Sequence, residues 1–378
     1  MTGAPRARDL AGPIGLLPPG PMNAITDVPG VRVGHTTLIA GDGPLVVGQG
    51  PVRTGVTVIV PHDGDPFREG VFAGCHRLNG NGELTGLEWI REAGLLSTPI
   101  ALTNTHSVGV VRDALCGVAA LSSGPEGAWA LPVVGETYDG TLNDIDGHHV
   151  SAEHLEAALA GAAGGLPAEG NVGGGTGMIC HGFKGGIGTA SRRLPDADGG
   201  FTVGVLVQAN YGERARLAID GIPVGREISL TEVPDPRVPR GPGATETGSI
   251  IAIVATDAPL LPGQCERLAQ RAGLGVARTG GAGAHSSGDL FLAFATGNRG
   301  IPATDRPAHP VVIREVRMLD DAAITPLFWA AIEATEEAIA NALVAARTLT
   351  GIDGVTAHAL PHDRLREIVA RHRSVRRG

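Results

Sequence analysis

Hydroxyl, amide and carboxyl side chains gather in this sequence at the ends of apolar, β-branched runs. They are Glu136 and Tyr138, Asn210, Ser249, and the Ser286–Asp289 segment. A serine hydroxyl attacks a carbonyl group once a base takes its proton, and a side-chain amide can stabilise the oxyanion that forms. Together they place polar groups where buried strands end, which is where α/β enzymes place their chemistry. Each member alone fits an ordinary strand end or turn equally well.

Ser249 differs from the other candidates in what precedes it. Residues 230–248 (LTEVPDPRVPRGPGATETG) hold four prolines and several charges without an apolar period, which indicates an exposed linker. The linker ends at a predicted strand whose first residue is Ser249. A domain boundary explains such a linker, and composition alone favours it; a processing site is the alternative.

Cleavage between Gly248 and Ser249 would place an α-amine on the serine itself. Such amines titrate at about 7.7–8.0 and can accept the hydroxyl proton near neutral pH. Ser287 linked to Asp289 is the other candidate for this base. The residues leave the choice open.

Three further motifs carry less weight. The glycine-rich segment Gly173–Gly186 lacks the glycine-lysine-serine/threonine ending of a phosphate loop, so turns are the better interpretation. The thirteen histidines show no metal-ligand spacing. Cys75 and His76 are adjacent, so on a strand they would point to opposite faces. We therefore expect neither a metal nor a cofactor.

Five apolar runs predict buried strands, and their lack of polar alternation indicates sheets covered on both faces. They span Gly55–Val60, Ile100–Thr103, Phe201–Gln208, Ser249–Thr256 and Leu290–Thr296. Three helices are expected between and after them, which makes the chain an α/β protein. The first runs from a Ser151 cap to about Ala163, the second covers Gln264–Ala272 and stops at Gly273, and the third runs from Thr325-Pro326 towards Gly351.

Composition narrows the class of protein. The 378 residues carry a formal charge of −9, which disfavours nucleic acid as a partner. Hydrophobic residues make up 42% and aromatic residues 3%, so the core must be built mainly from Val, Ile, Leu and Ala. Four widely spaced cysteines suggest free thiols in a reducing compartment. With no signal peptide or membrane-length apolar run, we expect a cytoplasmic protein with no membrane partner.

Nine stretches of the sequence, in order and along nearly the whole chain, resemble one enzyme family. They are NAITDVPGVRVGH (23–35), RTGVTVIVP (53–61), HRLNGNGELTG (76–86), LTNTHSVG (102–109), PVVGETYDG (132–140), GNVGGGTGMICHGFKGGIGTASR (170–192), VGVLVQANYG (203–212), TGSIIAIVATDAPLLPGQ (247–264) and SSGDLFLAFATGN (286–298). The family is that of the L-aminopeptidase/D-amino-acid esterase-amidases and β-peptidyl aminopeptidases, which includes the nylon-oligomer hydrolases.

The resemblance implies a four-layer αββα sandwich similar to the N-terminal-nucleophile hydrolases but with different strand connectivity, a fold shared with ornithine acetyltransferases. It implies self-cleavage into an α chain (1–248) and a β chain (249–378) that together form this one domain, and assembly of these αβ units as a homotetramer. The expected activity is removal of N-terminal residues from small peptides, amides or esters.

Site roles also follow from the resemblance. Ser249 matches the nucleophile, Asn210 and Tyr138 the oxyanion-stabilising pair, and Glu136 the acid that binds the substrate's free amine. Ser287 and Asp289 match the pair that supports the nucleophile; relatives often have the longer Glu in place of this Asp. An acyltransferase, which would normally carry Thr as its nucleophile, and an uncleaved binding protein remain as alternative functions.

Overall fold

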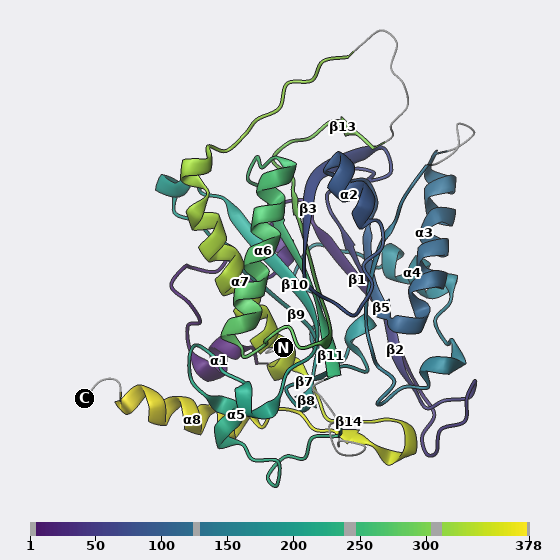
Figure 1. Ribbon diagram of the computed structural model, residues 1–378, viewed down its shortest axis with the longest axis vertical. Coiled ribbons are helices and arrows are strands. Elements are labelled where there is room, and N and C mark those ends of the chain that lie inside the picture. Colours follow the sequence, from purple (N-terminus) through teal and green to yellow (C-terminus); the bar gives the residue numbers. More distant parts are fainter. Residues whose placement is uncertain (1–4, 124–128, 238–246, 304–311, 376–378) are drawn as a thin grey trace.

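The computed structural model describes residues 5–123, 129–237, 247–303 and 312–375. Two β-sheets lie face to face, and helices cover the outer face of each, as the ribbon in Figure 1 shows. Helices α6 and α7 pack on one sheet, and α3 and α4 pack on the other. The described chain thus forms the αββα layers that the family resemblance implies.

The smaller sheet has four strands in the order β1-β2-β5-β6, and only its β5–β6 pair is parallel. These strands are β1 (Arg32–Ala40), β2 (Val52–Val60), β5 (Ile100–Asn104) and β6 (Val133–Thr137).

The larger sheet has seven strands in the order β13-β3-β12-β11-β10-β9, with β4 paired to β3. All neighbours are antiparallel except β11 and β12. These strands are β13 (Ile301–Pro302), β3 (Glu69–Gly80), β12 (Ser286–Ala295), β11 (Thr247–Thr256), β10 (Thr202–Asn210), β9 (Gly186–Arg193) and β4 (Leu95–Leu96). Two small hairpins, β7 (Ile179–Cys180) with β8 (Phe183–Lys184) and β14 (Leu349–Thr350) with β15 (Thr356–Ala357), lie outside both sheets.

The helices of the described chain are α1 (Ala7–Ala11), α2 (Leu87–Ala93), α3 (Val108–Ser123), α4 (Ala152–Ala160), α5 (Val224–Glu227), α6 (Pro262–Arg278), α7 (Thr325–Ala345) and α8 (His362–Val375). None of these described helices has the length and apolar character that a membrane crossing requires.

Strand β11 explains why the predicted strands lack polar alternation. Ile250 and Val254 belong to the core under the helices, whereas Ile251 and Ile253 belong to the core between the sheets. Successive side chains of a strand point to opposite faces, so a strand with apolar cover on both sides needs an apolar residue at every position. Aliphatic residues supply most of this core, as the low aromatic content requires.

The structure corrects the predicted end of the second helix. Helix α6 does not stop at Gly273 but continues to Arg278. Gly275 lies where α6 crosses α7, and a Cβ atom there would come within 2.5 Å of the Thr335 Cβ. The close crossing favours glycine inside the helix, so tertiary packing outweighs the helix-breaking tendency on which the prediction relied.

The other two helices end earlier than predicted. Helix α4 begins after Ser151 as expected but ends at Ala160, because Ala163 forms a β-bridge to Val33. Helix α7 ends at Ala345, well before Gly351. The chain then extends and forms β14 with the two residues that precede Gly351. In both cases strand pairing competes successfully with the last helical turn.

The predicted linker falls mostly outside the described residues, which omit 238–246. Beyond it, β11 begins at Thr247 and not at Ser249. The Gly248–Ser249 bond therefore lies inside a paired strand.

Candidate active site

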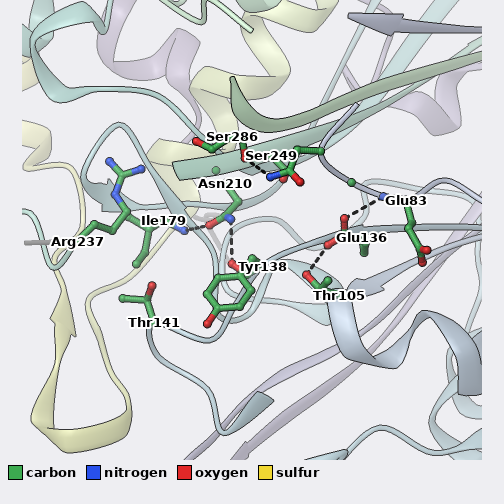
Figure 2. Close-up of a pocket in the computed structure, with 13 residues that line it drawn as sticks. Glu83, Thr105, Glu136, Tyr138, Thr141, Ile179, Asn210, Arg237, Ser249 and Ser286 are labelled. Carbon is green, nitrogen blue, oxygen red and sulfur yellow. Dashed lines mark hydrogen bonds between the residues drawn. The ribbon is translucent and has the colours of Figure 1, made fainter. Parts of the chain in front are cut away.

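A cavity of about 590 Å³ opens where strands of the two sheets end, a volume typical of small-molecule sites. Its lining comes from segments far apart in the sequence: Asn81, Gly82, Glu83, Thr105, Glu136, Tyr138, Thr141, Ile179, Asn210, Arg237, Gly248, Ser249 and Ser286 (Figure 2). The fold thus brings six of the residues singled out from the sequence into one cavity: Glu136, Tyr138, Asn210, Gly248, Ser249 and Ser286.

Strand register places Ser249 between two defined neighbours. Asn210 of β10 pairs with Ser249 of β11, which pairs with Gly288 of β12. Cross-strand partners share a face of the sheet, so the Ser249 and Asn210 side chains lie on the face between the sheets, like Ile251. Ser249 is only 5% exposed, and its hydroxyl oxygen accepts a hydrogen bond from the Gly288 N–H at 3.2 Å.

Gly248 is required by the close approach of β10. A Cβ atom at this position would lie 2.3 Å from the Asn210 carbonyl oxygen and 2.7 Å from the Tyr211 Cα. These are backbone atoms that cannot rotate away, so a larger residue would force β10 and β11 apart. The residue before the candidate nucleophile is therefore fixed as glycine by packing.

The hydrogen bonds of Asn210 define which way its amide points. Its Oδ1 accepts from the Ile179 N–H at 2.8 Å, so the other terminus is the Nδ2 group, which donates to the Tyr138 carbonyl oxygen at 2.9 Å. Nδ2 has a second hydrogen, and Asn210 lines the cavity together with Ser249. The amide is thus oriented as a donor toward an oxygen bound there.

Tyr138 reaches Asn210 through its main chain. The residue is 49% exposed, and its hydroxyl lies over Gly140, where a Cβ atom would come within 2.4 Å of it. In Figure 2 the ring extends toward Thr141, on the side away from Ser249. In this arrangement the Tyr138 carbonyl positions Asn210, while the hydroxyl is directed elsewhere.

Glu136 forms a buried carboxylate at another part of the cavity. It is 3% exposed, and its oxygens accept hydrogen bonds from the Thr105 hydroxyl at 2.5 Å and from the Glu83 N–H at 3.0 Å. Burial raises the pKa of Glu136, an effect that these two hydrogen bonds partly offset. An ionised carboxylate so removed from water is stabilised by a cation, which a protonated amine would supply.

Ser287 and Asp289 lie on the opposite face of the sheet from the Ser249 hydroxyl. They alternate with Gly288 along β12 and so share the helix-covered face with Phe291. The Ser287 hydroxyl donates to Asp289 Oδ1 at 2.6 Å, and Ser287 pairs across the strands with Gly248. The shorter Asp thus contacts this serine directly, and the pair lies beside the Gly248–Ser249 bond.

Lys184 is a contributor that the sequence interpretation missed. It is fully buried, and its Nζ donates to the carbonyl oxygens of Met178 at 2.7 Å and Gly185 at 2.9 Å. Burial lowers its pKa to about 7. These bonds hold the chain that carries the Ile179 N–H to Asn210. A lone lysine in an otherwise glycine-rich and apolar segment was the available signal.

Arg237 is the second residue that was missed. It lines the cavity from the predicted linker, where two arginines among prolines gave no distinguishing pattern. The Cys75–His76 pair, which was set aside on sequence grounds, contributes to packing and not to the cavity. Cys75 faces the core between the sheets while His76 stacks on Phe291 on the other face of β3. Within the described chain no cluster of three or more His, Cys, Asp or Glu residues could hold a metal.

Comparisons with known proteins identify the family of the chain. The model of peptidase family S58 matches residues 23–357. A protein of Sphingosinicella microcystinivorans described as beta-peptidyl aminopeptidase BapA is 50% identical over 98% of this chain and 93% of its own length. The protein of the same description from Sphingosinicella xenopeptidilytica is 47% identical over 97% of this chain and 91% of its own.

Two solved structures share the fold. The beta-aminopeptidase of a Burkholderia species superposes with a TM-score of 0.89 at 55% identity, covering 97% of this chain and 98% of its own. The L-aminopeptidase D-Ala-esterase/amidase of Ochrobactrum anthropi, a prototype serine aminopeptidase with a variant of the N-terminal-nucleophile hydrolase fold, gives 0.86 at 42% identity, covering 97% and 99%.

Fold and site together define a serine aminopeptidase with this variant of the N-terminal-nucleophile hydrolase fold. The chain belongs to peptidase family S58. The resemblance, the fold class and the hydrolytic function expected from the sequence are thereby confirmed, in preference to an acyltransferase or a binding protein.

Replacing Asn210 tests whether its amide stabilises the oxyanion. We expect Asn210→Ala to lower kcat by roughly 10²–10³, the usual effect of losing one oxyanion donor. Steady-state kinetics on an alanine anilide measure this. Tyr138→Phe removes the hydroxyl but keeps the carbonyl that holds Asn210. Normal turnover of a folded Tyr138→Phe enzyme would remove the hydroxyl from the mechanism.

Proposed function

We propose that the chain is a self-processing aminopeptidase that cleaves its own Gly248–Ser249 bond and then uses Ser249 to release single N-terminal residues from short peptides, amides or esters. The observation that carries this proposal is the register that places Ser249 beside Asn210 inside one cavity, with Gly248 next to the buried Ser287–Asp289 pair. Both reactions begin with attack of the same hydroxyl on a carbonyl group, which breaks the amide bond and forms an ester on Ser249, and water then hydrolyses that ester.

Self-cleavage would supply the base that the hydroxyl otherwise lacks. The products would be an α chain of residues 1–248 and a β chain of residues 249–378, which stay together as one domain because strands of both chains form the larger sheet. The new α-amine on Ser249 titrates near neutral pH and is attached to the nucleophile itself. Ser287 with Asp289, the other candidate, lies beside the same bond but on the opposite face of the sheet from the hydroxyl, so it would assist through the new amine.

Mass spectrometry of the purified protein tests the cleavage. We expect two fragments that end at Gly248 and begin at Ser249, and a single intact chain for Ser249→Ala, because the attacking hydroxyl is then missing. An intact wild-type chain after long incubation under native conditions would contradict the proposal.

Glu136 restricts the reaction to the first peptide bond. A substrate ammonium bound to this buried carboxylate places the adjoining carbonyl at Ser249 and leaves later bonds out of reach. Because burial raises the pKa of Glu136, its charged form predominates only at a pH above that raised pKa. In the free enzyme, kcat/KM therefore falls as the pH drops through a range above that of an ordinary glutamate.

Free and N-acetylated alanine anilides test this role. We expect the wild type to cleave only the free amine, and Glu136→Gln to lose roughly 10- to 100-fold in kcat/KM on it, as expected for one lost charge-assisted hydrogen bond. The acidic limb of the pH profile should also disappear in Glu136→Gln. Equal wild-type rates on both anilides would indicate a general amidase.

The descriptions of the relatives suggest the substrate class to examine first. Both Sphingosinicella proteins are described as beta-peptidyl aminopeptidases, so β-alanyl substrates belong in the assays beside L- and D-alanyl ones.

We propose a homotetramer of αβ units that works in the cytoplasm, where the free cysteines of this chain stay reduced. Light scattering on the native protein should give about four times the 38.5 kDa of one chain; a monomeric mass would refute the tetramer.

A further inference from the structure

The cavity has opposite charges at its two ends. Figure 2 shows the Glu136 carboxylate and the Arg237 guanidinium on opposite sides of Ser249 and Asn210. Glu83 also lines the cavity at the Glu136 end. A ligand bound across Ser249 therefore has an acidic environment on one side and a basic one on the other.

Arg237 is held in place by a specific set of contacts. Its Nε and Nη2 donate to the two oxygens of Asp235 at 3.1 and 3.0 Å, and Nη2 also donates to the Gly212 carbonyl oxygen at 2.9 Å. Its side chain is 15% exposed. Burial would raise the pKa of Asp235, but the Arg237 hydrogen bonds and charge lower it, so the carboxylate is ionised. The guanidinium is thus fixed at the cavity wall.

A second guanidinium, that of Arg214, lies near the Asp235–Arg237 pair. Its charge lowers the pKa of Asp235, which helps to keep this carboxylate ionised beside Arg237. Burial lowers the Arg214 pKa to about 10, which leaves it charged at neutral pH. Its donors are directed to carbonyl oxygens such as those of His181 and Gly182. Arg214 thus offsets part of the negative charge that Asp235 brings to Arg237, and Glu232 is a further carboxylate near Arg214.

We propose that Arg237 binds the carboxylate of the residue that leaves, which makes this enzyme selective for dipeptides with a free C-terminus. Along the cavity, the order is carboxylate, hydroxyl and guanidinium. In a dipeptide the order is ammonium, scissile carbonyl and carboxylate. The two patterns are complementary, and a planar guanidinium is well suited to a carboxylate. The inference rests on the proposed binding of the amine by Glu136.

The experiment compares two substrates that differ only in C-terminal charge: β-alanyl-L-alanine and its C-terminal amide. We expect the wild type to prefer the free acid by at least about 10-fold in kcat/KM, the value of one charge-assisted hydrogen bond. In Arg237→Met this ratio should fall close to one, and Arg237→Lys should retain part of it. Mass spectrometry on each variant verifies that the chain is processed.

Arg216→Met is the matched control. Arg216 lies on the same stretch after β10, but its side chain is 69% exposed and it does not line the cavity. This variant should keep the full wild-type ratio. An acid-to-amide ratio near one in the wild type would overturn the proposal. Equal losses of kcat/KM on both substrates in Arg237→Met would also overturn it. That second result would mean that Arg237 has a structural role or holds the new C-terminus of the α chain.

The two proposals fail in different ways. If Glu136 does not bind the amine, the wild type cleaves the N-acetylated anilide as fast as the free one, and anilides carry no carboxylate for Arg237. If Arg237 does not bind the carboxylate, the anilide selectivity stays intact while the acid-to-amide ratio is lost. Should Arg237→Met fail to mature, the wild-type ratio and Arg237→Lys still decide the question.

Discussion

The hydrogen-bond register of β11 between β10 and β12 is the constraint on which this site depends. It places Asn210, Ser249 and Gly288 side by side and directs the serine hydroxyl into the space between the sheets. A slip of one residue would turn Ser249 toward the helices and bring its neighbour to the cavity. The apolar residues of β11, which fill one core or the other according to their position, oppose such a slip along the whole strand. Core packing far from the cavity thereby positions the nucleophile.

Buried charged groups fix the segments that the sheet does not reach. Lys184 binds the carbonyl oxygens of the chain that leads to Ile179, whose N–H orients the Asn210 amide. On the far side of the sheet, Arg192 and Glu337 are both fully buried and form an ion pair at 2.8 Å, and Glu337 also binds Arg8. That contact attaches the N-terminal segment to α7. Such groups are costly to bury singly, so pairing or full hydrogen bonding is what makes these positions tolerable.

The sequence was informative where burial alone decides structure. The five predicted strands exist, because a nearly continuous apolar run suits a strand in a sheet covered on both faces. Helix ends were misplaced where another element competes, as at Gly275 in α6 and after Ala345 in α7. Strand ends revealed most of the candidate site. They could not reveal that Ser287 and Asp289 face away from the Ser249 hydroxyl, which depends on register, nor that Arg237 reaches the cavity from a segment without periodicity.

The position of the scissile bond inside a strand has a chemical consequence for the proposed reaction. In the unbroken chain, Gly248 lines the cavity and occupies space beside the nucleophile. Cleavage of the Gly248–Ser249 bond would create an ammonium group on Ser249 and a carboxylate on Gly248. The ammonium group would lie where Ser287 and Asp289 flank the cleaved bond, so the Asp289 carboxylate is already present to stabilise the new cation. The Gly248 carboxylate must leave the wall of the cavity before a substrate carbonyl can approach Ser249. Self-cleavage would thus both generate the base and free the site, and the ladder that aligns β11 with β10 and β12 would keep Ser249 in register after the covalent bond is lost.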